Sequence, residues 1–230
     1  MIQLLHTTLS PSSRFIRLLL SESGLGAECL EYMPWDRSEN LLIVNPAATL
    51  PVMIEDGIPP ISGAAVIAEY LDETRGPMLR ERRLVPDSPV ARAEMRRVIS
   101  WYLDKMDHEV VRYFATEKAY KRLAPAQFGS ASPDTARLRQ AKNNLRIHLT
   151  YTGYLLSQQD WIAHSRITFA DFAAAATISV VDYLGEINWD EYSLVRDWYA
   201  RLKSRPSFRP ILADKVKGVP PSVSYIDLDF

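Results

Sequence analysis

The chain has 230 residues, of which 47% are apolar, and it carries a formal net charge of −1 with a sequence pI of about 6.4. This length predicts one large domain or two small ones, and the near-neutral charge argues against nucleic acid or an anionic membrane surface as a partner. The single cysteine, Cys29, excludes an internal disulfide, and no apolar run approaches the roughly 20 residues that cross a bilayer. The N-terminus lacks the basic segment of a signal peptide, so we expect a cytoplasmic protein without direct membrane insertion.

The N-terminal segment predicts a strand, a helix and a second strand. Residues 2–6 form a short apolar strand, and residues 14–23 carry apolar side chains at helical spacing before Gly24, a typical residue for a helix end. Residues 28–33 form the second strand, and we expect Cys29 to be a buried, inert thiol within it. The loop that follows contains Trp35, which is either an interface anchor or a cover for the domain edge.

Residues 45–71 predict a compact strand, turn and helix. A strand starts at Leu50-Pro51, Gly57 closes a hairpin turn, and residues 64–71 have the apolar spacing of a helix.

The second half of the chain is predicted to be helical. Residues 76–89 are polar and rich in Arg, Pro and Gly, which predicts a linker. Thr168 and Asp171 form a capping box with Asp in place of Glu, so we expect Asp171 to have a structural role rather than a catalytic one. A charged cluster at residues 117–122 is either a solvated face or part of a binding edge. The expected helices span residues 90–123, 133–157, 169–184 and 192–205.

The run NPAATLPVM, followed by a Gly turn and a helix ending in Glu-Tyr-Leu, resembles the N-terminal domain of glutathione transferases. This resemblance implies a glutathione transferase fold: an α/β thioredoxin-like N-terminal domain and an all-α helical C-terminal domain. It also implies a cis peptide bond at Pro51, with Leu50 offering its backbone N–H and C=O to the cysteinyl part of glutathione. The predicted boundaries are 1–75 for the first domain, 76–89 for the linker, 90–217 for the helical domain and 218–230 for an extended tail. This tail is either a recognition element or a segment that folds back and packs over the helices.

The chain departs from this family at the glutathione site. Members use an acidic or Gln residue and a Ser at the start of the helix to grip the γ-glutamyl end of glutathione, and those positions are Gly63 and Ala64 here. A Ser, Tyr or Cys in the first loop activates the thiol, and Ser10 is the best positional match. Serines before a helix are usually caps, and Ser12 or Ser13 is expected to cap the helix here. We therefore treat Ser10 as a vestigial catalytic candidate.

A branch of the superfamily fits these departures. The degraded glutathione site and the tail resemble FtsZ-binding cell-division proteins, which implies a non-catalytic homodimer at the division site. Such a dimer would bind FtsZ filaments, alter their curvature and promote septal cell-wall synthesis, without glutathione or another cofactor. Our hypothesis for this role is that partners are contacted by Trp35, Glu117, Tyr225, Asp227, Leu228, Asp229 and Phe230.

Two other functions stay open at this point. One is a glutathione transferase with a relaxed glutathione site that uses Ser10, and the other is a ligand-binding protein that uses the interdomain cleft. A metal site is not expected, because the four histidines lack metal-ligand spacing and the chain has no CxxC motif.

Overall fold

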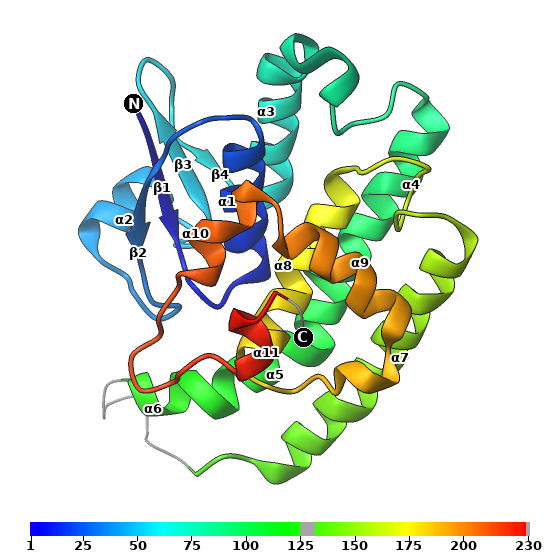
Figure 1. The fold of residues 1–230 in the computed structure, drawn as a ribbon. Coiled ribbons are helices and arrows are strands. Elements are labelled where there is room, and N and C mark those ends of the chain that lie inside the picture. Colours follow the sequence, from blue (N-terminus) through cyan, green and yellow to red (C-terminus); the bar gives the residue numbers. More distant parts are fainter. Residues whose placement is uncertain (125–131, 229–230) are drawn as a thin grey trace.

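Figure 1 shows the computed structural model of the chain, which describes residues 1–124 and 132–228. A four-stranded sheet with the strand order β2-β1-β3-β4 lies at one end of the molecule. β1 pairs parallel to β2 and antiparallel to β3, and β3 pairs antiparallel to β4. The strands are β1 (Ile2–His6), β2 (Glu28–Glu31), β3 (Val52–Glu55) and β4 (Ile61–Ser62).

Both faces of the sheet are covered by helices. α1 (Pro11–Glu22) and α3 (Ala64–Leu79) share one apolar core with β1 and β3. The short α2 (Glu39–Val44), which the sequence did not predict, buries Leu41 against the other face. This arrangement confirms the predicted thioredoxin-like domain. α3 continues beyond residue 75, so its last turn occupies the start of the segment predicted to be a linker.

The helix predicted over residues 90–123 is one continuous helical rod, but it is not α-helical throughout. It consists of α4 (Pro89–Ser100), α5 (Arg112–Ala115) and α6 (Lys121–Leu123), joined by two π-helical segments, Trp101–Val111 and Thr116–Tyr120. Pro89 is at the first helical position, as predicted. π-Helical turns are rare and often occur at functional sites, and both segments here contribute residues to a cleft described below.

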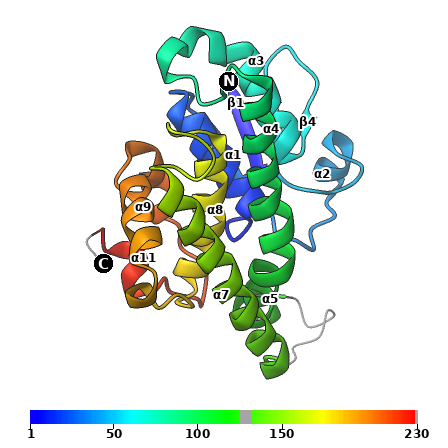
Figure 2. The same ribbon diagram turned by 90° about the vertical axis from the view of Figure 1, so that its right-hand side faces the viewer.

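The other helices surround a fully buried one. α8 (Phe169–Tyr183) runs between α9 (Ser193–Lys203) and the rod in Figure 2, with α7 (Thr135–Gln158) beside it. The predicted capping box is present: the Thr168 amide donates to Asp171 Oδ2 at 2.8 Å. Asp171 also accepts hydrogen bonds from the Ile162 amide and the Trp198 indole, at 3.0 and 3.1 Å. This confirms a structural role for Asp171.

The two halves of the molecule meet where α1 packs against α8. The rings of Phe15 and Phe169 meet edge to face, with 6.1 Å between their centroids. Because the loop between β1 and α1 leads directly into α1, this packing fixes the position of that loop relative to the helical domain. Across the described residues, no helix is long and apolar enough to cross a membrane.

Two expectations about exposure and conformation are wrong. Cys29 is exposed rather than buried, because β2 is an edge strand of the sheet. Partial desolvation nevertheless raises the pKa of its thiol, which argues against a reactive thiolate. The tail is not extended throughout, since Val223–Ile226 forms a helical turn, α11, that folds back on α8. The shorter helix α10 (Arg209–Leu212) precedes it.

Candidate functional site

Ser10 is the N-cap of α1. Its backbone is extended, and its hydroxyl accepts a hydrogen bond from the Ser13 amide at 3.3 Å. The prediction that Ser12 or Ser13 is the cap is therefore wrong. Ser13 is buried, and its hydroxyl accepts from the Thr7 amide at 3.1 Å. Because a hydroxyl that accepts a capping bond still has its own proton to donate, Ser10 keeps the donor that a thiolate would need.

One side chain shapes the loop before β3. Asn45 Nδ2 donates to the carbonyl and hydroxyl oxygens of Thr49, at 2.7 and 3.0 Å. Ala48 in this loop has a φ of +50°, which is uncommon for a residue other than Gly. The Leu50–Pro51 peptide bond is cis, as the family resemblance implies. Among the described residues, the Leu50 amide and carbonyl have no hydrogen-bond partner, which leaves both groups for a ligand to pair with.

The start of α3 lacks polar side chains. Gly63 occupies the N-cap with a φ of +93°, and its amide donates to the Pro51 carbonyl at 3.0 Å. A Cβ atom at Gly63 would meet no heavy atom within 4 Å. Ala64 follows as the first helical residue. Neither Gly63 nor Ala64, which match the positions where the family binds the γ-glutamyl group, has a side chain that donates or accepts a hydrogen bond. The space beside Gly63 is open.

Two hollows lie at this end of the molecule, and the predicted site residues are divided between them. A cleft of about 350 Å³ is lined by Ser10 and Leu50 on one side and by Asp107, Arg112 and Tyr120 of the rod on the other. Burial raises the pKa of the Asp107 carboxyl to about 6, although Arg112 opposes this from 4.0 Å.

A larger cavity of about 540 Å³ lies between α3 and α4, and its lining includes Gly63, Ala64 and Ser12. The serine that shares a hollow with Gly63 and Ala64 is therefore Ser12 rather than Ser10.

Trp35 spans the boundary between the two halves. Its half-buried ring meets Tyr120 edge to face, with 5.9 Å between centroids and an interplanar angle of 88°. Pro34 and Arg37 on either side line the cleft. The contact with Tyr120 agrees with the alternative in which Trp35 covers the edge of its domain. A contact between Trp35 and a partner stays a prediction.

Glu117 is not at a solvated face, and this part of the prediction is wrong. Its side chain is 0% exposed, and its carboxylate lies 2.5 Å from Lys121 Nζ. It also accepts from the Asp134 amide at 2.7 Å, just before α7. Glu117 therefore ties the end of the rod to the start of α7, and a partner cannot touch it without a rearrangement.

The described part of the tail is anchored rather than free. Tyr225 is fully buried: its hydroxyl donates to the Ile211 carbonyl at 2.7 Å, and its ring packs on Tyr183. It therefore contributes no side-chain surface where we expected a partner contact. Asp227 and Leu228 are exposed. The predicted contact residues Asp229 and Phe230 lie outside the described residues.

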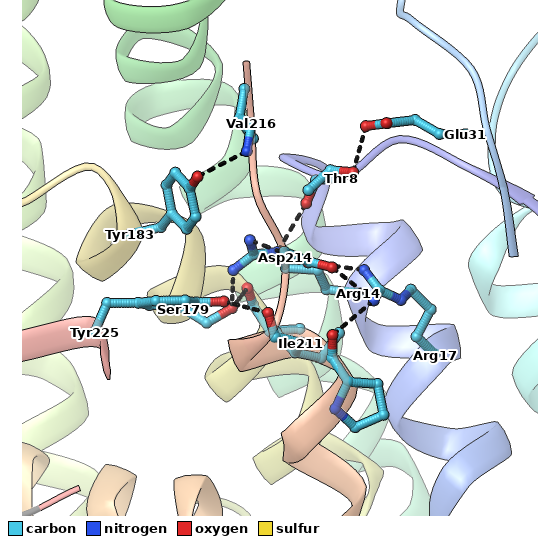
Figure 3. A network of polar contacts seen from close by, with 12 residues as sticks. Thr8, Arg14, Arg17, Glu31, Ser179, Tyr183, Ile211, Asp214, Val216 and Tyr225 are labelled. Atoms are coloured by element: carbon cyan, nitrogen blue, oxygen red, sulfur yellow. Dashed lines mark hydrogen bonds and ion pairs between the residues drawn. The ribbon is translucent and has the colours of Figure 1, made fainter. Parts of the chain in front are cut away.

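Sequence reasoning missed a buried arginine network, which Figure 3 shows. Arg14 is fully buried on α1, and it donates to the Thr8 carbonyl and the Ser179 hydroxyl, both at 2.8 Å. Arg17 binds Asp214 through two bonds of 2.8 Å. This network links α1 to α8 and to the segment after α10. The signal was available, since Arg14 is four residues before Leu18 and therefore shares its buried helix face.

No group of three or more His, Cys, Asp or Glu residues in the described chain could hold a metal ion.

Comparisons with known proteins find a matching protein family for both halves of the chain. Residues 4–79 match the model of the glutathione S-transferase N-terminal domain, and residues 106–206 match that of the C-terminal domain. The chain is 40% identical over 228 residues to FtsZ-localized protein A of Caulobacter vibrioides, covering 98% of this chain and 96% of that protein.

Two solved structures are similar over the whole chain. A protein from Sinorhizobium meliloti described as a glutathione S-transferase is 47% identical, with a TM-score of 0.97 and full coverage of both chains. FzlA from C. crescentus is 39% identical, with a TM-score of 0.91, covering 100% of this chain and 99% of that one.

Proposed function

The chain belongs to the glutathione S-transferase family, and on that basis we propose that it is a non-catalytic member that associates with FtsZ filaments at the site of cell division. Support comes from its similarity to a protein named for its localisation with FtsZ, which extends over almost the whole of both chains. A cytoplasmic location follows from this role, because FtsZ-associated proteins must reach the filament.

The observation that carries the non-catalytic part is the pair Gly63 and Ala64. A hydrogen bond to a charged group contributes roughly 1.5–3 kcal/mol, so two missing bonds weaken glutathione binding by about 3–6 kcal/mol, or two to four decades in Kd. The backbone amides at the start of α3 and the amide and carbonyl of Leu50 are what remains for glutathione.

The mechanism we propose uses a homodimer. A two-fold dimer offers two copies of the same surface, so it can occupy neighbouring FtsZ subunits, alter filament curvature and gain avidity from weak single contacts. Trp35, braced by Tyr120, is the aromatic anchor in this proposal. The exposed Asp227 and Leu228 in the tail then promote septal cell-wall synthesis through a second division partner.

The test combines two measurements on one preparation: calorimetry with glutathione and co-sedimentation with polymerised FtsZ. We expect no measurable heat with glutathione and pelleting with FtsZ. The variant Trp35→Ala should weaken pelleting by about 30-fold or more while the glutathione result stays unchanged. Micromolar glutathione affinity without pelleting would refute the proposal.

One observation favours a second candidate, a glutathione transferase with a relaxed site. Ser10 and Leu50 line the same cleft, which is the arrangement needed to hold and activate a thiol. This candidate predicts retention on immobilised glutathione and conjugation activity that is lost in Ser10→Ala. A ligand-binding protein would instead bind an apolar molecule tightly in the cleft without turnover, and the same calorimetry with an apolar probe distinguishes it.

A further inference from the structure

A buried lysine holds the C-terminal segment in place. Lys203 is the last residue of α9, and its side chain is 0% exposed. Its ammonium donates to the carbonyl oxygens of Ser224 and Asp227, at 2.7 and 2.6 Å. These carbonyls lie in and just after α11, where the last turn of a helix has no partners of its own. Lys203 therefore donates hydrogen bonds to carbonyl groups that would otherwise lack partners at the C-terminal end of α11.

A buried carboxylate on α8 completes this anchor. Asp182 is fully buried, and its Oδ2 lies 3.9 Å from Lys203 Nζ. Its Oδ1 accepts from the Trp189 indole at 3.0 Å and from the Ser224 hydroxyl at 2.8 Å. The Ser222 hydroxyl donates to the Asp182 carbonyl at 2.6 Å. Both members of the charged pair therefore bond directly to the C-terminal segment.

Stability alone does not account for this pair. Removing an ammonium and a carboxylate from water is costly, and a well-packed apolar pair often gives equal or higher stability. Burial lowers the pKa of Lys203 to about 8, while Asp182 and Asp227 raise it, so the ammonium persists at neutral pH. The ring of Tyr199 also faces it, 5.5 Å away. An apolar pair could not form the directional hydrogen bonds that hold the backbone after residue 221.

The anchored segment presents an apolar outer face. Val223 is 86% exposed, Ile226 63% and Leu228 43%, and Asp227 lies between the last two. In sequence, Asp229 and Phe230 repeat the acid–apolar pair. Apolar side chains that a short terminus holds in one position bind a partner without the ordering cost of a free tail.

We propose that Lys203, together with Asp182, is a positioning residue that fixes the C-terminal segment as a rigid docking element for a partner with an apolar groove edged by basic side chains. The basic edge follows from the acidic residues that alternate with the apolar ones. The docking part of this inference rests on the proposed division role, whereas the anchoring part does not.

The anchoring is tested by hydrogen–deuterium exchange on the full chain. In Lys203→Met, we expect the amides of Tyr225 and Asp227 to exchange about 10- to 100-fold faster, as the loss of one charge-assisted hydrogen bond implies. The control Lys215→Met removes an exposed lysine on the same segment and should leave exchange unchanged.

A double variant separates anchoring from general destabilisation. Lys203→Met alone leaves the Asp182 carboxylate buried without its cation, so α8 should also lose protection. Asp182→Asn in the same chain removes that charge and should restore protection in α8, while the tail amides stay fast. Restored protection of the tail in the double variant, or unchanged exchange in Lys203→Met, would overturn the anchoring.

The docking is tested with Ile226→Ser, which leaves the anchor intact. We expect this variant and the double variant to pellet with FtsZ like the parent and yet fail to support division in cells that depend on the chain. Normal division in either variant would overturn the docking element. Failure of the parent to pellet would instead count against the proposed function and leave the exchange result standing.

Discussion

Replacing Ala64 by Ser puts a hydroxyl at the first position of α3, where the family binds the γ-glutamyl group. Ala64 already has helical backbone geometry, so the change introduces no strain. One restored hydrogen bond to a charged group corresponds to about 1.5–3 kcal/mol, so we expect Ala64→Ser to tighten glutathione binding by roughly 10- to 100-fold.

Gly63→Gln restores the second polar side chain at the start of α3, but it strains the backbone. The φ of +93° and ψ of +135° at Gly63 form a combination that residues with a side chain rarely adopt, and a side chain there costs about 1–3 kcal/mol in backbone strain. The site itself is open, because a Cβ would meet nothing within 4 Å. That strain is present with and without glutathione, so it lowers the free energy of unfolding rather than the affinity, and the double variant should bind roughly 10- to 100-fold more tightly than Ala64→Ser alone.

Calorimetry with glutathione on both single variants and the double variant tests these differences, and the parent, from which we expect no measurable heat, is the baseline. Ala65→Ser is the matched control, since it adds the same hydroxyl one residue further along α3 at an exposed position. Equal affinity in Ala64→Ser and Ala65→Ser would refute the reasoning. It would mean that the missing side chains are not what weakens the site.

Three other changes test separate parts of the structure. Trp35→Ala should weaken FtsZ pelleting by about 30-fold or more, the size of an interface hot spot, and Tyr120→Phe should leave pelleting intact because it keeps the ring contact; equal losses in both variants would contradict an anchor at Trp35. Burial lowers the pKa of His6 to about 4, so its imidazole stays neutral in the folded chain, whereas the same group in the unfolded chain gains a proton below about pH 6.5. The free energy of unfolding should therefore fall by up to about 3 kcal/mol as the pH drops from 6.5 towards 4. Urea denaturation of His6→Gln should not show this loss. Asp171→Ala strands buried donors, the Trp198 indole among them, and should lower the free energy of unfolding by at least about 3 kcal/mol in urea, whereas a loss below about 1 kcal/mol would contradict its role as the core cap.

Local patterns in the sequence predicted most of the fold. The capping box at Thr168 and the proline start at Pro89 depend only on neighbouring residues, and both are present as predicted. The predictions that failed concern exposure set by distant parts of the chain. Cys29 has the pattern of a buried strand residue, but β2 lies at the edge of the sheet. Glu117 has the spacing of a solvated charge, but Asp134 and α7 cover it.

The candidate site was predictable only in part for the same reason. Counting residues assigned Ser10, Leu50, Gly63 and Ala64 to one predicted site, but it could not show that two hollows divide them. The buried pair of Lys203 and Asp182 has no local signature either, because the groups it bonds to lie about 20 and 40 residues further along the chain.

Residues at and near the predicted glutathione site also have structural tasks. Ser10 caps α1, and replacing such a cap by Ala costs about 1 kcal/mol whether or not a thiol is ever bound. Asn45 holds the loop before β3 by its bonds to Thr49. These residues therefore cannot by themselves distinguish an enzyme from a binding protein. Gly63 and Ala64 can, because no structural contact in the described chain requires a polar side chain at either position, so only a need for glutathione would preserve one there.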